Sequence, residues 1–251
     1  MGKNRWLYRV LAIVFACVFV FSGINVAIAL ENYRKARSLY SQTQDVFVEE
    51  PETVEAKDET KTEMAPITVD FSGLLKRNKD VIGWVYCPDT VIHYPVVQGN
   101  DNKEYLHTGL NGNSLTSGTI FVDYRNQKIG QDVNYIVYGH NMMNKTMFGS
   151  LVNYKKQSYY DKHPVMYYLT PTMDYRIELV AGCVVKTKEM IYQTQPDPMA
   201  FYEYLTRMQK RSTFQSGLTV TPKDRIVTLS TCSYEFDNAR YVVVGKLIPL
   251  Q

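Results

Sequence analysis

The sequence predicts a mainly β domain, a barrel or a sandwich, behind a single N-terminal membrane helix. About eight short runs rich in β-branched and aromatic residues follow residue 80, with turn residues between them and few helical stretches. Near the N-terminus, an apolar run of 21 residues contains no charge. The chain of 251 residues is 45% hydrophobic, which gives room for one ordinary domain that can bury a core.

The first element is the apolar run, residues 10–30, which is about long enough to cross the roughly 30 Å hydrocarbon layer as a helix. Lys3, Arg5 and Arg9 precede it, so we expect residues 1–9 in the cytoplasm and everything after the span outside the cell. A cleaved signal peptide is the alternative, because residues 27–29 (Ala-Ile-Ala) have the small-x-small form of a cleavage site. The length of the run favours a membrane anchor.

The next segment, residues 31–68, is predicted to be an acidic extracellular stalk. Between Asp45 and Glu63 the chain is acidic and poor in large apolar side chains, so it cannot bury enough surface to offset the entropy of ordering. The pairs Leu39-Tyr40 and Val46-Phe47 are too sparse to form a core. We therefore expect the stalk to hold a folded domain, residues 69–251, away from the membrane.

The folded domain contains the β-patterned runs and three predicted helices. The helix at 198–210 is the best marked, with Asp197 as N-cap, Pro198 at the first position, and an apolar face along it. Shorter helices are predicted at 71–77 and 146–154. The predicted strands are 81–87, 92–98, 118–124, 133–140, 165–170, 175–186, 225–232 and 240–248.

Charge and motif content exclude several functions. A formal net charge of +3, without Lys/Arg-rich runs interleaved with aromatics, argues against nucleic-acid binding. The sequence has no zinc-site spacing and no Gly-rich phosphate loop, so we expect no metal and no cofactor. Cys87, Cys183 and Cys232 follow the span, which itself contains Cys17, so at least one external thiol lacks a partner within the chain. A buried free thiol or an intermolecular disulfide would also explain this.

Cys232 is the candidate nucleophile, because it ends the β-patterned stretch "VTLSTCS", where a buried structural cysteine has little reason to lie. A reactive thiolate needs a neighbouring cation and a proton donor for the leaving group. His140, at the end of "VNYIVYGH", can supply the proton. Arg240 begins the last strand eight residues after Cys232, so a hairpin can bring its guanidinium beside the sulfur. These residue types predict an extracellular acyl-transfer site.

Simpler roles remain open for these groups. His93, His107 and His163 are more simply interpreted as surface or packing residues than as the catalytic base. Arg240 could instead form a surface ion pair with Glu235 or Asp237, since such pairs are common.

The stretch from about residue 71 to residue 248 resembles class B sortases, membrane-anchored cysteine transpeptidases of Gram-positive bacteria. The resemblance rests on "NKDVIGWVYCPDTVIHYPVVQGNDNKEYL", "GTIFVDYRN", "YIVYGHN" and "TLSTC" with a downstream arginine. It implies a closed eight-stranded β-barrel with N-terminal helices and an extra helix before the seventh strand. That helix corresponds to the one predicted at 198–210.

The resemblance also implies residue roles. Cys232 would attack a C-terminal sorting signal (Asn-Pro-x-Thr-like) of a secreted surface protein, His140 would act as general acid and base, and Arg240 would hold the substrate and stabilise the oxyanion. An amine of a peptidoglycan precursor, lipid II-like, would then resolve the thioester. Groove-lining positions are implied as well, although ordinary packing on a barrel wall explains them equally; these are Leu106, Thr187, Ile191, Tyr192 and Ser230.

Three other functions are weighed against wall anchoring. One is a membrane-tethered β-barrel that binds a peptide without catalysis, and another is a plain cysteine endopeptidase, which would share the acyl-enzyme. The third is a pilus-assembling sortase. A class C enzyme is disfavoured because no Asp-Pro-aromatic lid motif precedes the domain and no second apolar run follows it.

Overall fold

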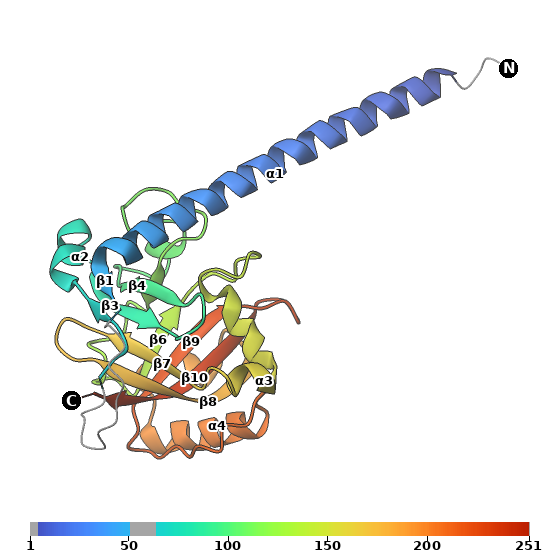
Figure 1. Cartoon of the computed structure of the whole chain (residues 1–251). Coiled ribbons are helices and arrows are strands. Elements are labelled where there is room, and N and C mark those ends of the chain that lie inside the picture. The colour runs from blue at the N-terminus through green and yellow to red at the C-terminus, as the bar shows by residue number, and fades with distance from the viewer. Residues whose placement is uncertain (1–4, 51–63, 251) are drawn as a thin grey trace.

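A closed barrel of eight strands forms the centre of the computed structural model, which describes residues 5–50 and 64–250 (Figure 1). The strand order around the barrel is β10-β8-β7-β3-β4-β5-β6-β9, and the pairs β4–β5 and β6–β9 are parallel while the others are antiparallel. The predicted closed barrel is therefore confirmed. Its strands are β3 (Val81–Tyr86), β4 (His93–Val97), β5 (Ile120–Val122), β6 (Asn134–Tyr138), β7 (Val165–Leu169), β8 (Tyr175–Lys186), β9 (Ile226–Cys232) and β10 (Ala239–Pro249).

The sequence of strand β10, at the centre of the barrel, does not alternate between apolar and polar residues. Tyr241 and Val243 point into the barrel interior, whereas Val242 and Val244 point outward into a second apolar cluster. Helix α4 (Pro198–Lys210) covers that outer face, contributing its buried Phe201, Leu205 and Met208. Both faces of the strand are thus buried, which explains its continuous apolar run.

The short helices lie close to their predicted positions. Asp197 caps α4 by accepting a hydrogen bond from the Ala200 amide (2.9 Å), and Asp70 caps α2 (Phe71–Arg77) in the same way. The helix predicted at 146–154 is a 3₁₀ helix, η2 (Phe148–Lys155), followed by α3 (Gln157–Tyr160). Two more 3₁₀ turns, η1 (Glu104–Leu106) and η3 (Met190–Tyr192), lie near the end of the barrel that carries Cys232.

The structure differs from the predicted stalk over residues 31–49. Helix α1 (Arg5–Phe47) continues without a break beyond the apolar run, and β1 (Val48–Glu49) pairs with β2 (Thr68–Val69). Ala36, Leu39, Tyr40 and Thr43 are buried against the barrel. They occupy positions i, i+3, i+4 and i+7, so they lie on one face of the helix, a pattern that a count of large side chains overlooks. Most of the acidic stretch, residues 51–63, lies outside the described residues.

Two polar contacts fix α1 on the barrel in addition to this buried face. The Tyr40 hydroxyl hydrogen-bonds the Gly118 carbonyl and the Thr119 hydroxyl, and Gln44 Nε2 donates to the His93 carbonyl at 2.7 Å. The direction in which α1 leaves the barrel is therefore defined by packing.

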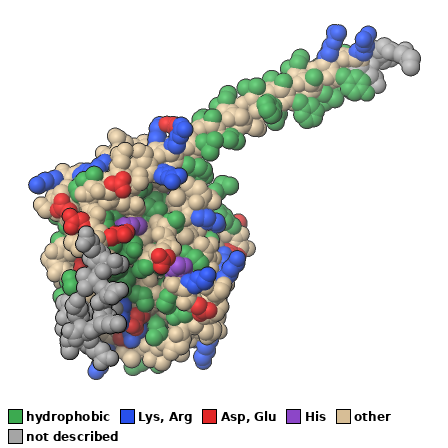
Figure 2. Space-filling view, viewed as in Figure 1, with side chains coloured by type: hydrophobic (Ala, Val, Ile, Leu, Met, Phe, Trp, Pro, Cys, Tyr) green, Lys and Arg blue, Asp and Glu red, His purple; other side chains and the backbone are tan. Residues whose placement is uncertain are grey.

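The other half of α1 is an apolar rod without protein neighbours. Of the helices in the described ranges, α1 is the one long and apolar enough to cross a membrane, and its most apolar window is fully exposed. Figure 2 shows hydrophobic side chains covering this protruding half. Such a surface is typical of a helix that lies in lipid.

Candidate active site

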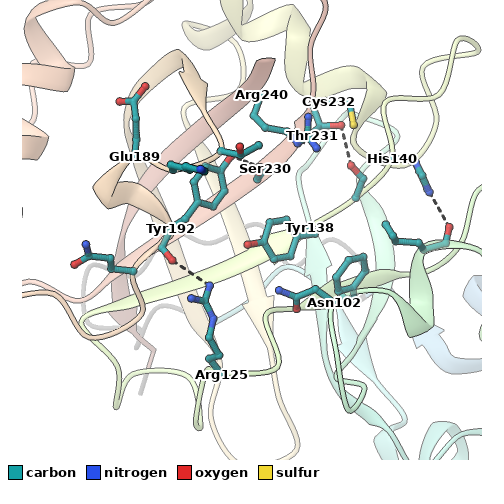
Figure 3. Close-up of a pocket in the computed structure, with 16 residues that line it drawn as sticks. Asn102, Arg125, Tyr138, His140, Glu189, Tyr192, Ser230, Thr231, Cys232 and Arg240 are labelled. Carbon is teal, nitrogen blue, oxygen red and sulfur yellow. Dashed lines mark hydrogen bonds between the residues drawn. The ribbon is translucent and has the colours of Figure 1, made fainter. Parts of the chain in front are cut away.

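Three strand ends meet at one rim of the barrel. Strand β9 lies between β6 and β10, and its register places Ser230 beside Tyr138 and Cys232 beside Arg240. Beyond the last β6 pair, the Gly139 amide donates to the Ser230 carbonyl (3.1 Å). His140 follows directly, so the structure brings all three predicted catalytic residues to the same cavity (Figure 3).

Cys232 differs from the other cysteines of the barrel by its exposure. Cys87 and Cys183 are free thiols buried in the protein, as one of the alternatives for unpaired cysteines requires, and burial raises the pKa of both. Cys232 is also free but partly exposed and lines the cavity. Its backbone is fixed by the Asn141 side chain, whose Nδ2 donates to the Cys232 carbonyl at 2.8 Å. The thiol is therefore both positioned and accessible.

His140 is held by the loop on the opposite side of the cavity. Its Nε2 lies 2.7 Å from the Leu106 carbonyl, and its ring stacks on His107 with centroids 5.4 Å apart. A carbonyl oxygen only accepts, so Nε2 carries a proton and, in the neutral ring, Nδ1 is free to act as a base. Burial lowers the pKa of His140, the Leu106 hydrogen bond partly opposes this, and the neighbouring His107 lowers it further. No hydrogen bond joins His140 to Cys232 in the described structure.

Arg240 is not engaged by the acidic residues of the adjacent loop. Its Nη1 donates to the Ala239 carbonyl at 3.0 Å, and within the described ranges no ion pair joins it to Glu235 or Asp237. Glu235 instead pairs with Lys155 and accepts from Ser233. The guanidinium thus keeps free donors facing the cavity, and the ion-pair alternative for Arg240 finds no support.

The cavity has a volume of about 500 Å³, and four of the five predicted groove residues line it. Ile191 does not, contrary to the prediction: it is fully buried and packs in the cluster beneath α4. The tight turn of η3 directs successive side chains in different directions, so Tyr192 faces the cavity while Ile191 faces the core. The residues that line the cavity as predicted are Leu106, Thr187, Tyr192 and Ser230.

Tyr192 forms one wall of the cavity close to the rim that carries Cys232 and Arg240. Its hydroxyl hydrogen-bonds Ser230 at 2.9 Å, and its ring stacks on Tyr138 with centroids 6.3 Å apart. Burial raises the pKa of Tyr192 to about 12, against the opposing effects of Ser230 and the Arg240 charge. The phenol therefore stays protonated and can donate to a peptide.

A buried carboxylate organises the far end of the cavity, and this feature was not predicted. Asp123 is fully buried and accepts hydrogen bonds from Arg125 (2.7 and 2.8 Å), Asn102 (3.0 Å) and Tyr138 (3.0 Å). Burial raises the pKa of Asp123, but these donors outweigh it, so its pKa is lowered. Arg125 in turn donates to the Tyr192 carbonyl at 3.1 Å. The quoted motif "GTIFVDYRN" contains Asp123 and Arg125, and a carboxylate directly after a buried strand was the available signal.

The cavity lining is rich in hydrogen-bonding groups and aromatic rings. In the part of the chain that the structure describes, no cluster of three His, Cys, Asp or Glu side chains is suited to hold a metal ion. The lining instead combines aromatic faces, hydroxyls and two guanidinium groups, which match the carbonyls and side chains of an extended peptide.

Comparison with known proteins gives a consistent result. A family model described as the Sortase domain matches residues 85–248. Sortase B of Listeria monocytogenes is 32% identical over 251 residues, covering 99% of both chains. A Staphylococcus aureus sortase B–substrate complex is 35% identical, with a TM-score of 0.67 over 71% of this chain and 84% of that one. A sortase B complexed with triglycine has the same identity and TM-score, over 71% of this chain and 85% of its own.

Proposed function

Since the chain belongs to the sortase family of cysteine transpeptidases, which anchor surface proteins, we propose that Cys232 is its nucleophile, His140 its general acid and base, and Arg240 its oxyanion-binding residue. The observation that carries this proposal is the pairing of β9 with both β6 and β10, which gathers the three residues at one cavity. Each contributes a different part of the chemistry.

The first half of the reaction makes a thioester. His140 takes the thiol proton as Cys232 attacks the carbonyl carbon of the sorting signal, and the carbonyl oxygen becomes an oxyanion facing the Arg240 guanidinium. As the peptide bond breaks, His140 returns the proton to the departing amine. The surface protein is then bound to Cys232 and its C-terminal fragment leaves.

The second half transfers the protein to an amine. The incoming amine attacks the thioester carbon, His140 accepts its proton, and the thiol leaves with a proton from the same ring. A solved sortase B holds triglycine, a compound with a terminal amine, and another holds a substrate. These complexes support a peptide substrate and an amine acceptor for this chain. The proposed partners are an Asn-Pro-x-Thr-like signal and a lipid II-like precursor amine.

The arrangement of residues along the cavity supports an extended peptide that binds with a defined direction. The signal would run from the Asp123–Arg125 end, past Tyr192 and Ser230, to Cys232. Thr187 and Leu106 would contact it from the two sides. Polar groups at both ends and aromatic rings between them favour a short motif with polar residues flanking an apolar one.

We also propose the topology. Residues 10–30 of α1 cross the membrane, residues 1–9 lie in the cytoplasm, and the barrel lies outside. The exposed apolar window of α1 supports the span, and Arg5 and Arg9 before it support the orientation.

The test is product analysis by mass spectrometry with the full chain in detergent micelles. A library of Asn-Pro-x-Thr peptides is incubated with and without triglycine, and Cys232→Ala serves as the control. We expect an amide of the N-terminal peptide fragment with triglycine, and no product with the variant. Peptide binding without any conversion would show a non-catalytic barrel, and hydrolysis that triglycine never diverts would show an endopeptidase.

A further inference from the structure

Two loops beside the active site expose apolar side chains that the catalytic proposal does not use. They are residues 141–147, which follow His140, and residues 233–238, which follow Cys232; together we name them the rim loops. Met143 is 86% exposed and Tyr234 80%, and Phe236 is exposed too. Both loops line one shallow depression, so they lie side by side. Neighbouring exposed apolar side chains on a barrel typically mark an interaction surface.

Measured along the axis of α1, the rim loops lie at the height where the apolar run of this helix ends. A cavity of about 750 Å³ between α1 and the barrel is lined by Leu30 and Tyr33 on the helix and by Asn144 and Thr146 of the first rim loop. Leu30 is the last residue of the predicted span. In Figure 1 both rim loops project from the barrel on the side toward which α1 leaves it.

This level is fixed by the packing of α1. The helix is continuous from the apolar run to Phe47, and Leu39, Tyr40 and Gln44 hold it against the barrel. Because α1 is straight and continuous through Leu30 and Ala36, a bilayer around residues 10–30 would reach the rim loops.

The charges of the rim loops indicate that a membrane contact at this surface would depend on apolar side chains and not on charge attraction. Lys145 and Asp237 have opposite signs, and Glu235 is already paired with Lys155. Electrostatic attraction to anionic lipid is therefore weak at this surface. Transfer of methionine and aromatic side chains from water into the headgroup and upper acyl region lowers the free energy. Tyrosine is enriched in this region in membrane proteins.

We propose that the rim loops dock into the surface of the same membrane that holds α1, through Met143, Tyr234 and Phe236. The proposal rests on the membrane span given under the proposed function. It places the mouth of the active site at the bilayer surface, because His140 and Cys232 are the residues from which the two loops begin. An amine carried on a lipid would then meet the thioester without leaving the membrane.

The test uses tryptophan fluorescence of the full chain in phosphatidylcholine vesicles, with and without bromine on the acyl chains, which quenches nearby indoles. Trp84 is fully buried in the barrel and gives a constant background, whereas Trp6 lies beside the span. A Trp6→Phe background is therefore combined with Met143→Trp or Tyr234→Trp. Matched controls are Met199→Trp on α4 and Met173→Trp between β7 and β8, two exposed positions on other parts of the barrel.

We expect brominated lipid to reduce the emission at positions 143 and 234 and to leave positions 173 and 199 unchanged. If bromine left the emission unchanged at all four positions, the proposal would be overturned. Quenching at all four positions would also overturn it, because that result would show unspecific contact. Raising the salt concentration should not reverse the quenching at 143 and 234.

Two further measurements separate this proposal from the others. Quenching of Trp6 in the unmodified chain reports whether the span is inserted; its absence would overturn both the span and the docking. Peptide cleavage in micelles reports the catalytic proposal independently of any bilayer. Cleavage with an inserted span but unquenched rim loops would refute membrane docking alone.

Discussion

Cys232 and Arg240 lie directly opposite each other in the antiparallel pairing of β9 and β10. Residues in such a pair project from the same face of the sheet, so thiol and guanidinium share one side of the barrel wall. The short loop between the strands sets this register. The Ser233 amide closes the loop by donating a hydrogen bond to the Ala239 carbonyl (3.0 Å). An oxyanion formed at Cys232 would therefore develop within reach of the Arg240 donors.

Replacing Arg240 distinguishes its geometry from its charge. If its planar fork of N–H donors binds the oxyanion, Arg240→Lys should lose nearly as much activity as Arg240→Ala, because an ammonium cannot reproduce the fork. We expect both to lower kcat/KM by roughly 10²–10³, as for loss of one oxyanion donor. Turnover of a sorting peptide measures this. Substantial rescue by lysine would leave Arg240 with an electrostatic role only.

His140→Ala should lower turnover by roughly 10²–10⁴, because the leaving amine would depart without a proton. His163→Ala is the matched control, since His163 packs against Tyr159 away from the cavity. Circular dichroism should show the same fold in both variants. A more severe loss in the His163 variant would mean that the wrong histidine has been assigned.

The acid limb of the activity profile should lie below pH 6.5, the ordinary pKa of histidine. Burial lowers the pKa of His140, so its neutral form, which is proposed to take the thiol proton, persists to lower pH. The His107 ring adds to this lowering. His107→Gln should therefore raise the pKa of His140 and move the acid limb of kcat/KM upward. An unchanged limb would show that His107 exerts no electrostatic effect on His140.

Asp123→Asn should weaken peptide binding more than catalysis. The change removes the charge that holds Arg125 and, through it, the Tyr192 carbonyl, while keeping the shape of the side chain. We expect KM to rise severalfold with little change in kcat, because Cys232 and His140 lie at the other end of the cavity. Asp161→Asn, at an exposed position outside the cavity, is the control. A fall in kcat alone would contradict the positioning role.

Leu39→Ala tests the packing of α1 on the barrel. Replacing a buried leucine by alanine typically lowers the free energy of unfolding by about 2–5 kcal/mol. Here the substitution should weaken the contact between α1 and the barrel. Residues 31–47 should then be cut faster by protease in micelles, whereas Ser38→Ala, on the exposed side of the same helix turn, should behave like the parent. Equal cleavage of all three would indicate that the contact contributes little to stability.

The sequence determined the elements of the barrel and the three residues proposed for the chemistry. Runs such as "RYVVVGKLI" become strands because their side chains favour a buried extended backbone, and Asp197-Pro198 starts α4 because both residues suit a helix N-terminus. Cys232, His140 and Arg240 were recognisable because each ends or begins such a run and their motifs resemble a known family. All of these signals depend on residues close together in the chain.

Tertiary structure alone decided which of these groups meet and what surrounds them. Asn102 and Asp123 are 21 positions apart, and Asp123 and Tyr138 are 15 apart, so their contacts depend on how the barrel closes. The buried face of α1 around Leu39 becomes a core only when a barrel wall lies against it. Likewise, the orientation of η3 sends Ile191 inward and Tyr192 into the cavity. Local pattern cannot specify such contacts, because their free energy comes from partners that only the closed fold brings together.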